Sequence, residues 1–592
     1  MKRRSHSIMA QPLKWALVGL VPTLALGCAE TTKSPALPET AGTIAFAISE
    51  TPRNPVQVST TGYGDYLAAL IAGNRNDLSS AADYMQRALG YDPDNPALVR
   101  RTFHLLAADG RLAEARVLAR QVIESNPEES VANLVLAVEQ IEQGEINGAA
   151  ERLEGLPKRG LDTVMVPLVH SWLLQGQGEL DEAVASLEPL RKRDGLSLLA
   201  DMHTALMYDQ AGEPAQAKPS YVKALGDGTR SSLRLTRLAA NFYLRNGEPE
   251  AAQALFDQAR GADEGSSLLE AMAAQDAGQS DSPRPVIRDH KDGAAEVLFN
   301  LAGLLSQERA EDVALIYTHQ ALSLRPDFEM ARMLLGEILE RKGRDEQAIA
   351  AYRLIEPASP LAWVARLRIS EALERLERTD DAIRELEIMA AERPDSFEPL
   401  YRVGGLLRSQ ERFGEAVDVY DRAVERLGEP AQRHWSLLYF RGIALERSGD
   451  WARAEQDFLK ALELQPEQPY VMNYLAYSWV EKKLNLEEAE RMLIRAVELR
   501  PNDGFIVDSL GWVYFQLGEY DKAVTNLERA VELRPQDPVI NDHLGDAFWR
   551  VGRRQEARFQ WRRSLSLDPE EDLVSVIEAK IDEGLEADPE NI

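Results

Sequence analysis

The chain has 592 residues and a formal net charge of −29, from 67 Lys and Arg against 96 Asp and Glu. A single hydrophobic core does not extend over so many residues, so the length indicates several domains or a quasi-linear array. The acidic balance argues against nucleic acid as the main partner, because phosphate binding requires clustered positive charge.

Residues 1–27 have the composition of an export signal. Basic residues come first, and the apolar stretch 15–26 is too short to span a bilayer as a stable helix. The segment ends in Ala25-Leu26-Gly27-Cys28, and Cys28 is the only cysteine of the sequence. This ending resembles the lipobox of bacterial lipoproteins, with Ala25 where that family prefers Leu. The resemblance implies cleavage by signal peptidase II before Cys28, which then carries lipid. An ordinary cleaved signal with an unmodified thiol is the alternative.

The residues after the cysteine are interpreted as a lipidated tether, residues 28–61. Ala29 stands where an Asp typically holds such lipoproteins in the inner membrane, so the resemblance implies the periplasmic face of the outer membrane. The tether is rich in Thr, Pro and Ser, and fully extended it reaches roughly 100 Å. Its apolar patch, residues 44–48, leaves a second interpretation open: a short helix that docks on the folded part or on a partner.

From residue 62 onward, glycine, alanine and proline recur at a nearly constant spacing, most clearly in two consecutive copies over residues 502–569. The recurring positions are Leu510, Gly511, Tyr514, Gly518, Ala523, Ala530 and Pro535 in the first copy, and Leu544, Gly545, Phe548, Gly552, Ala557, Ser564 and Pro569 in the second. The period of 34 residues and the order L-G-x-x-Y/F…A…P resemble the tetratricopeptide repeat.

Each copy predicts a hairpin of two antiparallel helices. Small residues such as Gly511 and Ala523 allow the two helices to approach closely, and larger ones beside them fill the gaps. Gly518 falls just past the first helix, where a left-handed residue is required, and Pro535 stops the second helix. A single hairpin cannot bury its apolar face alone. The sequence therefore predicts an all-α solenoid of stacked hairpins.

The N-terminal series of repeats covers residues 62–264 and contains six copies. The glycine that ends the first helix recurs in it at Gly144, Gly178, Gly212 and Gly247. Residues 265–292 then break the register, with Pro283 and Pro285 among mixed charges. This segment is interpreted as an interruption or hinge between two superhelical segments. The alternative is a degenerate repeat packed in line.

The C-terminal series covers residues 293–569 and contains eight copies, which makes about fourteen in all. The copies end at Pro326, Pro360, Pro394, Gly428, Pro466, Pro501, Pro535 and Pro569. Residues 570–592 are interpreted as a capping helix and tail, because the last hairpin of a solenoid otherwise exposes an apolar face.

The sequence gives no sign of catalysis or of a metal site. None of the eight histidines lies three to five residues from another, so no helical metal-binding pair exists. Neither G-x-x-x-x-G-K-S/T nor H-E-x-x-H is present. We therefore expect no enzymatic activity, no metal and no cofactor other than the covalent lipid on Cys28.

Binding is predicted in the last repeats. The resemblance implies a concave groove lined by the second, fifth, ninth and twelfth places of each repeat. In the last three repeats these places and one neighbour are mostly aromatic: Tyr470, Asn473, Tyr474, Tyr477, Phe505, Trp512, Phe515 and Trp549. Earlier in the series they include acids such as Glu337 and Glu371. Aromatic and amide side chains suit an extended or helical peptide. The alternative is that these rings wedge between hairpins as packing.

The whole architecture resembles the outer-membrane tetratricopeptide lipoproteins that serve as adaptors for periplasmic carboxy-terminal processing proteases. The resemblance implies a PDZ-containing serine protease as partner, together with its protein substrates, such as cell-wall hydrolases. The adaptor itself would be non-catalytic and held at the outer membrane by its lipid. The alternative function is a scaffold for an envelope machine, such as a pilus or an exopolysaccharide export complex.

Overall fold

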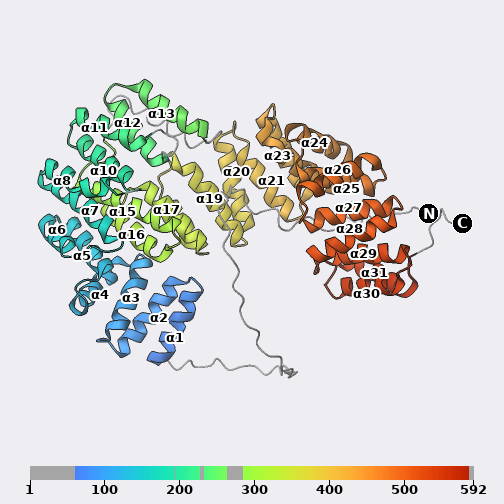
Figure 1. Ribbon diagram of the computed structural model, residues 1–592, viewed down its shortest axis with the longest axis horizontal. Helices are drawn as coiled ribbons and strands as arrows, with labels where there is room; N and C mark the ends of the chain where they lie inside the picture. Colours follow the sequence, from blue (N-terminus) through green and yellow to red (C-terminus); the bar gives the residue numbers. More distant parts are fainter. Residues whose placement is uncertain (1–60, 194, 227–231, 263–284, 586–592) are drawn as a thin grey trace. The chain divides into compact units, whose positions relative to one another are not determined.

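The computed structural model describes residues 61–193, 195–226, 232–262 and 285–585, and these residues form helices with no strand among them (Figure 1). The chain divides into two compact units, with the boundary between Glu385 and Leu386. The described residues up to Glu385 form the N-terminal unit, and those from Leu386 onward form the C-terminal unit.

The N-terminal unit begins with six helical hairpins. They pair α1 (Gly62–Asn74) with α2 (Leu78–Tyr91), α3 (Pro96–Ala108) with α4 (Leu112–Ser125), α5 (Ser130–Gln143) with α6 (Ile146–Glu154), α7 (Asp162–Gln177) with α8 (Leu180–Ser186) and α9 (Glu188–Arg191), α10 (Ser197–Gln210) with α11 (Pro214–Leu225), and α12 (Leu233–Arg245) with α13 (Pro249–Ala262). After the gap at 263–284 the unit continues with α15 (His290–Gln307), α16 (Glu311–Leu324), α17 (Glu329–Arg341), α18 (Asp345–Arg353) and α19 (Leu361–Arg375).

The boundary between the units lies inside α20 (Thr379–Glu392). The C-terminal unit then comprises α21 (Glu398–Ser409), α22 (Phe413–Leu427), the short 3-10 helix η1 (Gln432–His434), α23 (Trp435–Arg447), α24 (Trp451–Leu464), α25 (Pro469–Glu481), α26 (Leu486–Leu499), α27 (Gly504–Gln516), α28 (Tyr520–Leu533), α29 (Pro538–Arg550), α30 (Arg554–Leu565) and α31 (Glu571–Glu583). Six hairpins before the gap and eight after it give fourteen in the described residues. The predicted all-α solenoid of hairpins is confirmed.

The hairpin of α27 and α28 shows why the recurring residues are needed. Asp503 caps α27 by accepting a hydrogen bond from the amide of Phe505. A Cβ at Gly511 would lie 2.6 Å from Cγ of Leu527, so only glycine allows this approach of the two helices. Gly518 ends the helix at φ +76°, in the left-handed region that favours glycine. The local sequence therefore fixes the shape of each hairpin.

In the N-terminal unit the chain after the gap returns to the first six hairpins. Helix α15 packs against α7 and α10, and α16 packs against α3 and α5, as Figure 1 shows for the green and blue helices. All four partners are the first helices of their hairpins. One hydrophobic core accordingly runs from Leu134 of α5 to Ala331 of α17. The interruption predicted at 265–292 lies largely outside the described residues.

In the C-terminal unit the described hairpins follow one another in chain order. The first helices of consecutive hairpins are in contact, α25 with α27 and α27 with α29. Helix α31 packs on α30 and buries Leu573 and Ile577. The row of first helices in this unit carries the aromatic residues considered next.

Candidate protein-binding surface

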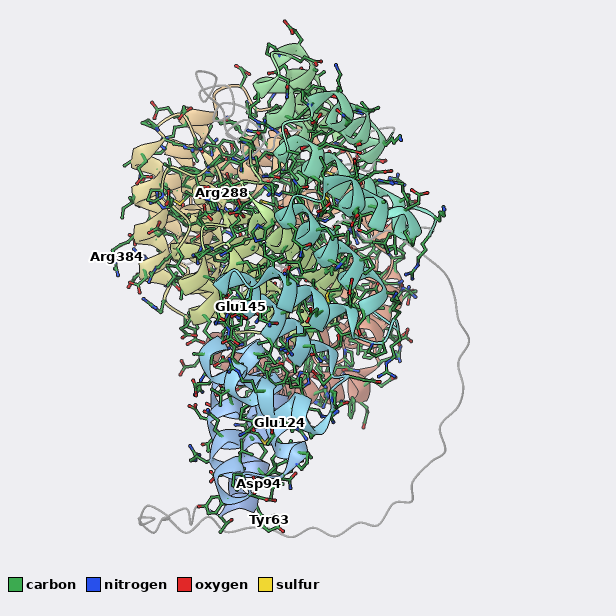
Figure 2. The ribbon with its side chains drawn as sticks, turned by 90° about the vertical axis from the view of Figure 1, so that its left-hand side faces the viewer. Tyr63, Asp94, Glu124, Glu145, Arg288 and Arg384 are labelled. Atoms are coloured by element: carbon green, nitrogen blue, oxygen red, sulfur yellow. The ribbon has the colours of Figure 1, made fainter. Side chains whose placement is uncertain are left out.

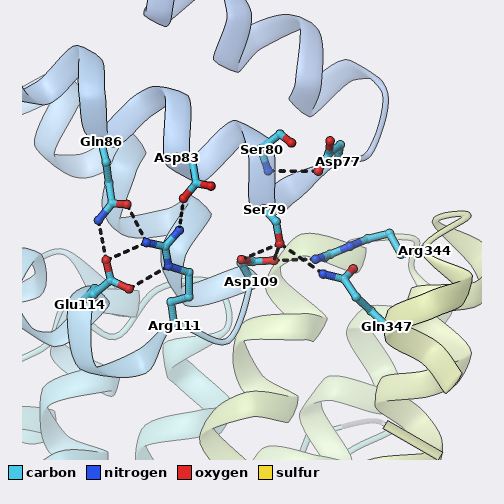
Figure 3. Close-up of polar contacts among 10 residues, drawn as sticks. All are labelled: Asp77, Ser79, Ser80, Asp83, Gln86, Asp109, Arg111, Glu114, Arg344 and Gln347. Atoms are coloured by element: carbon cyan, nitrogen blue, oxygen red, sulfur yellow. Dashed lines mark hydrogen bonds and ion pairs between the residues drawn. The ribbon is translucent and has the colours of Figure 1, made fainter. Parts of the chain in front are cut away.

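The first helices of the N-terminal unit are tied to helices that come much later in the chain. Figure 3 shows Asp109, which directly follows α3, between Ser79 of α2 and Arg344 in front of α18. Arg344 donates to Asp109 at 2.5 Å, and Gln347 donates to Ser79 at 3.2 Å. The side chains of Arg344 and Asp109 are only 7% and 5% exposed, so this ion pair is buried.

A second buried ion pair joins α12 to α15. Arg234 donates to the two carboxylate oxygens of Glu296 at 3.0 and 2.5 Å, and the Glu296 side chain is fully buried. Burial alone would raise the pKa of Glu296, but the Arg234 guanidinium outweighs it and holds the pKa below its usual range. The carboxylate is therefore charged at neutral pH and locks α15 to α12.

Between these pairs, α15 lies directly against α7. A Cβ at Gly293 would lie 2.0 Å from Cδ2 of Trp172, so the backbone of α15 touches the indole ring. The indole Nε1 donates to Nδ1 of His203 on α10 at 3.0 Å. Burial lowers the pKa of His203 to about 4, so the ring is neutral at pH 7 and accepts this hydrogen bond.

These contacts fill the face that the first helices of the N-terminal unit present. Lys291 at the start of α15 adds a hydrogen bond to the carbonyl of Glu142 at 2.9 Å, and Ser323 of α16 donates to the side chain of the same residue. The occupant of this face is thus the chain itself, from α15 to α18.

The C-terminal unit holds all eight aromatic and amide residues predicted for a groove, and each is partly exposed. Four lie on α25 (Tyr470, Asn473, Tyr474 and Tyr477), three on α27 (Phe505, Trp512 and Phe515) and one on α29 (Trp549). They differ in what they contact, which separates packing residues from residues that a partner could reach.

Three of the seven rings, those of Tyr470, Tyr474 and Phe505, pack against neighbouring side chains. Tyr474 lies against Tyr439 and Phe458, with ring centroids 6.1 and 5.2 Å apart. The guanidinium of Arg500 lies over Tyr470, and Phe505 packs in a small apolar cluster between α27 and α29. Tyr474 therefore behaves as a wedge between hairpins, the alternative that the sequence left open.

Trp512 and Phe515 form the centre of a ring cluster. The Trp512 ring stacks on Phe515 of the same helix and on His543 of α29, with centroids 4.8 and 4.0 Å apart. The indole nitrogen of Trp512 donates to Glu481 at 2.8 Å, and Nδ1 of His543 lies 3.0 Å from Asp508. Burial lowers the pKa of His543, but the Asp508 carboxylate outweighs this and raises it overall. Carboxylates therefore hold the cluster in place.

Tyr477 and Asn473 continue the cluster along α25. Burial raises the pKa of Tyr477 well above its ordinary value, and the carboxylates of Glu481 and Asp508 add to this. The side-chain oxygen of Asn473 is buried and has no hydrogen-bond partner within the described residues. Asn473 thus carries a buried acceptor that the described residues leave unsatisfied. We call Asn473, Tyr477, Trp512 and Phe515 the inner band.

Trp549 lies apart from the inner band, beneath the end of the last helix. A Cβ at Gly584 would be 1.9 Å from Cζ2 of Trp549, so the backbone after α31 rests on this ring. Lys580 of α31 donates to Asp542 and Asp546 at 2.7 and 2.8 Å. Helix α31 thus occupies the inner positions of the last hairpin, and the reachable part of the row consists of α25 and α27.

Comparison with known families agrees with the repeat register. Models described as tetratricopeptide repeat match residues 106–165, 304–362, 367–431 and 435–468, and one described as TPR repeat matches 511–552. Tetratricopeptide repeats are thus recognised over these five stretches of the chain. No curated protein matches it.

Several solved structures are similar to this chain at low sequence identity. In the APC/C hetero-tetramer Cut9–Hcn1, one chain is 15% identical, with 89% of this chain and 97% of that chain covered and a TM-score of 0.36. MamA from Desulfovibrio magneticus RS-1 is 24% identical over 29% of this chain and 96% of its own, with a TM-score of 0.26. The TPR protein YrrB is 21% identical over 33% and 97%, with a TM-score of 0.27.

Among the described residues, no cluster of three or more His, Cys, Asp and Glu could hold a metal ion. No helix of the same residues is long and apolar enough to cross a bilayer. Cys28, the signal and the tether lie outside the described residues. Sequence reasoning missed His543, whose place beside the groove positions shows only when α27 and α29 are seen side by side.

Proposed function

We propose that this tetratricopeptide chain is a non-catalytic scaffold whose inner band binds a segment of another protein. One observation carries the proposal: the first helices of the N-terminal unit are covered by α15 to α18, while α25 and α27 present partly exposed rings. Tetratricopeptide repeats suggest a role in protein–protein interaction or as a scaffold.

The chemistry of the inner band suits an extended peptide, whose main-chain N–H groups are not hydrogen-bonded within the peptide, that presents an apolar side chain. Trp512 and Phe515 offer a stacked aromatic surface, which supplies large contact area at low entropic cost. Asn473 adds an amide on the same face of α25 as Tyr477, four residues away. The carboxylates of Glu481 and Asp508 surround the rings and disfavour acidic segments.

In its finer form, the proposal is a lipid-anchored adaptor of a periplasmic carboxy-terminal processing protease. Support comes from the lipobox-like ending at Cys28, the tether at 28–61 and the long array of repeats. The adaptor would hold the protease at the outer membrane and present substrates such as cell-wall hydrolases.

Binding is tested with the inner band altered and a matched control. Tyr477→Ala with Phe515→Ala is expected to weaken binding of the captured partner about tenfold or more, because truncated hot-spot rings lose that much. Phe559→Ala on α30 is the control, since this ring is 64% exposed on a second helix of the same unit. Equal binding by both variants, at unchanged thermal stability, would reject the inner band as the surface.

The partner and the anchor are tested separately in the bacterial envelope. The full chain is used to capture proteins from envelope extract. A PDZ-containing serine protease supports the adaptor, whereas a secretin or a polymer porin supports the envelope-machine scaffold. Cys28→Ser is expected to abolish labelling by radioactive palmitate and to move the protein from the membrane to the soluble fraction. Unchanged membrane association would argue against the lipid anchor.

A further inference from the structure

Helix α1 exposes an apolar stripe along its length. Tyr63, Leu67 and Ile71 follow at intervals of four residues and are 88%, 58% and 55% exposed. Figure 2 shows Tyr63 at the tip of this first hairpin. Side chains four residues apart share one face of a helix, so the three form a continuous surface. The one charged residue of α1, Asp65, is buried and paired with Arg87 at 3.0 Å.

Elsewhere in the described residues, large exposed apolar side chains occur singly. No two of the others share a helix: Tyr91, Val117, Leu198, Val222, Leu304, Leu354, Ile388, Leu459, Leu484, Ile494, Phe559 and Val576. Isolated exposed apolar residues are ordinary on soluble proteins. A stripe of three is different, because contiguous apolar surface is usually covered by something.

The other end of the array shows what a covered end looks like. There α31 packs on the last hairpin, where Leu573 and Ile577 are 7% and 0% exposed and Lys580 reaches two carboxylates. A solenoid of hairpins requires such a cap at each end, because each hairpin otherwise buries its outer face against a neighbour. No described residue covers α1 in this way.

We propose that residues 43–49 of this same chain cover the stripe on α1. Their sequence is Thr-Ile-Ala-Phe-Ala-Ile-Ser, with no charge and three large apolar residues. They lie outside the described residues. The exposed stripe on α1 is therefore seen in the structure, and the apolar segment is inferred from the sequence. When two uncharged apolar surfaces lie close together in one chain, contact between them removes both from water, which is favourable.

The length of chain between the two surfaces fits this arrangement. A flexible coil as long as residues 50–61 has a root-mean-square end-to-end distance of about 20 Å. Helix α1 has 13 residues and is therefore also about 20 Å long. The segment reaches any part of the stripe without stretching the linker. Tethering also gives it an effective concentration on the order of millimolar, so weak docking is enough to populate the covered state.

Docking would also shorten the arm that holds the repeats at a membrane. With the lipid proposed for Cys28, the free arm becomes residues 29–42 rather than 29–61. Its greatest reach falls from roughly 100 Å to about 50 Å. The first hairpin then stays near the anchor.

Disulfide trapping in the full-length chain tests the proposal. Cys28→Ser removes the only natural thiol, and Ile48→Cys with Leu67→Cys introduces one pair. The control pairs Ile48→Cys with Val117→Cys, which replaces an isolated side chain of similar exposure, 56% against 58%. The intramolecular disulfide of the first pair is expected to form at least about tenfold faster than that of the control. Adding Ile44→Ser and Phe46→Ser should remove this difference.

The other outcomes would overturn the proposal. Disulfide-linked dimers would show that a second copy covers the stripe, and equal rates for the two pairs would show that the segment does not dock. Hydrogen exchange of the chain without introduced cysteines gives an independent reading. Amides of residues 43–49 are expected to be protected, and Leu67→Ser with Ile71→Ser should remove the protection. Exchange at the unprotected rate in the unaltered chain would refute docking.

Discussion

Removing one member of the buried pair between Arg234 and Glu296 is expected to release α15 from the first hairpins. Glu296→Leu leaves the guanidinium buried without its partner, beside a second guanidinium, that of Arg325, over the ring of Phe328. Breaking one partner of a buried pair typically costs about 3–5 kcal/mol. We expect a loss of this size in the free energy of opening α15.

Arg234→Leu is expected to cost less than Glu296→Leu. The reason is that Arg325 remains close enough to lower the pKa of Glu296 after Arg234 has gone. In the double variant no buried charge is left unpaired at these two positions, so the loss should be smaller than that of Glu296→Leu alone. The coupling free energy between the two positions should then be about 2–3 kcal/mol.

Hydrogen exchange measured over α15 is the suitable assay, because an array of repeats does not unfold in one step. The matched control is the pair Lys218–Glu248 of the same unit, which is 2.7 Å long but 48% and 38% exposed. Removing it should leave the protection of α15 unchanged. If Glu296→Leu changes the opening free energy by less than about 1 kcal/mol, or if the two single effects simply add, the pair does not hold α15 in place.

Three further predictions concern single positions. His203 has a pKa of about 4 in the folded chain against 6.5 when unfolded, so the unfolded chain binds more protons between these values. The free energy of opening α10 should therefore fall by about 3 kcal/mol as the pH drops from 6.5 to 4, and His203→Gln should flatten the profile measured by hydrogen exchange over α10. Gly293→Ala places a methyl group inside the Trp172 ring and should increase exchange over α15, whereas Gly303→Ala, where a Cβ meets nothing, should not. Lys580→Met leaves two carboxylates of α29 without their cation and should make α31 sensitive to proteolysis, an effect that unchanged cleavage would contradict.

The shape of each hairpin could be predicted from the sequence because its causes are local. Gly511, Gly518 and Ala523 lie within thirteen residues of one another and act through helix approach and helix termination alone. The packing of α15 against α7 could not be predicted, because it depends on the contact of Gly293 with Trp172, 121 residues earlier. No repeated spacing in the sequence indicates that contact.

The candidate site shows the same division. The sequence places the aromatic residues on first helices, which follows from the repeat register. It does not distinguish Trp512, which joins a ring cluster, from Tyr474, which wedges between hairpins, because both are aromatic residues on first helices. Trp549 is covered by Gly584, which directly follows α31 and lies outside the repeats.

The long-range contacts of the N-terminal unit change how this part of the chain must fold. Repeat arrays usually fold by adding one unit to its neighbour, with contacts close in sequence. Here Asp109 pairs with Arg344, and Glu142 pairs with Ser323. Neither contact can form before the later residue of the pair has been synthesised. A chain that emerges from its N-terminus therefore presents α3, α5 and α7 uncovered until more than a hundred further residues have followed. Shortened versions that stop before α15 are expected to expose that surface permanently and to aggregate.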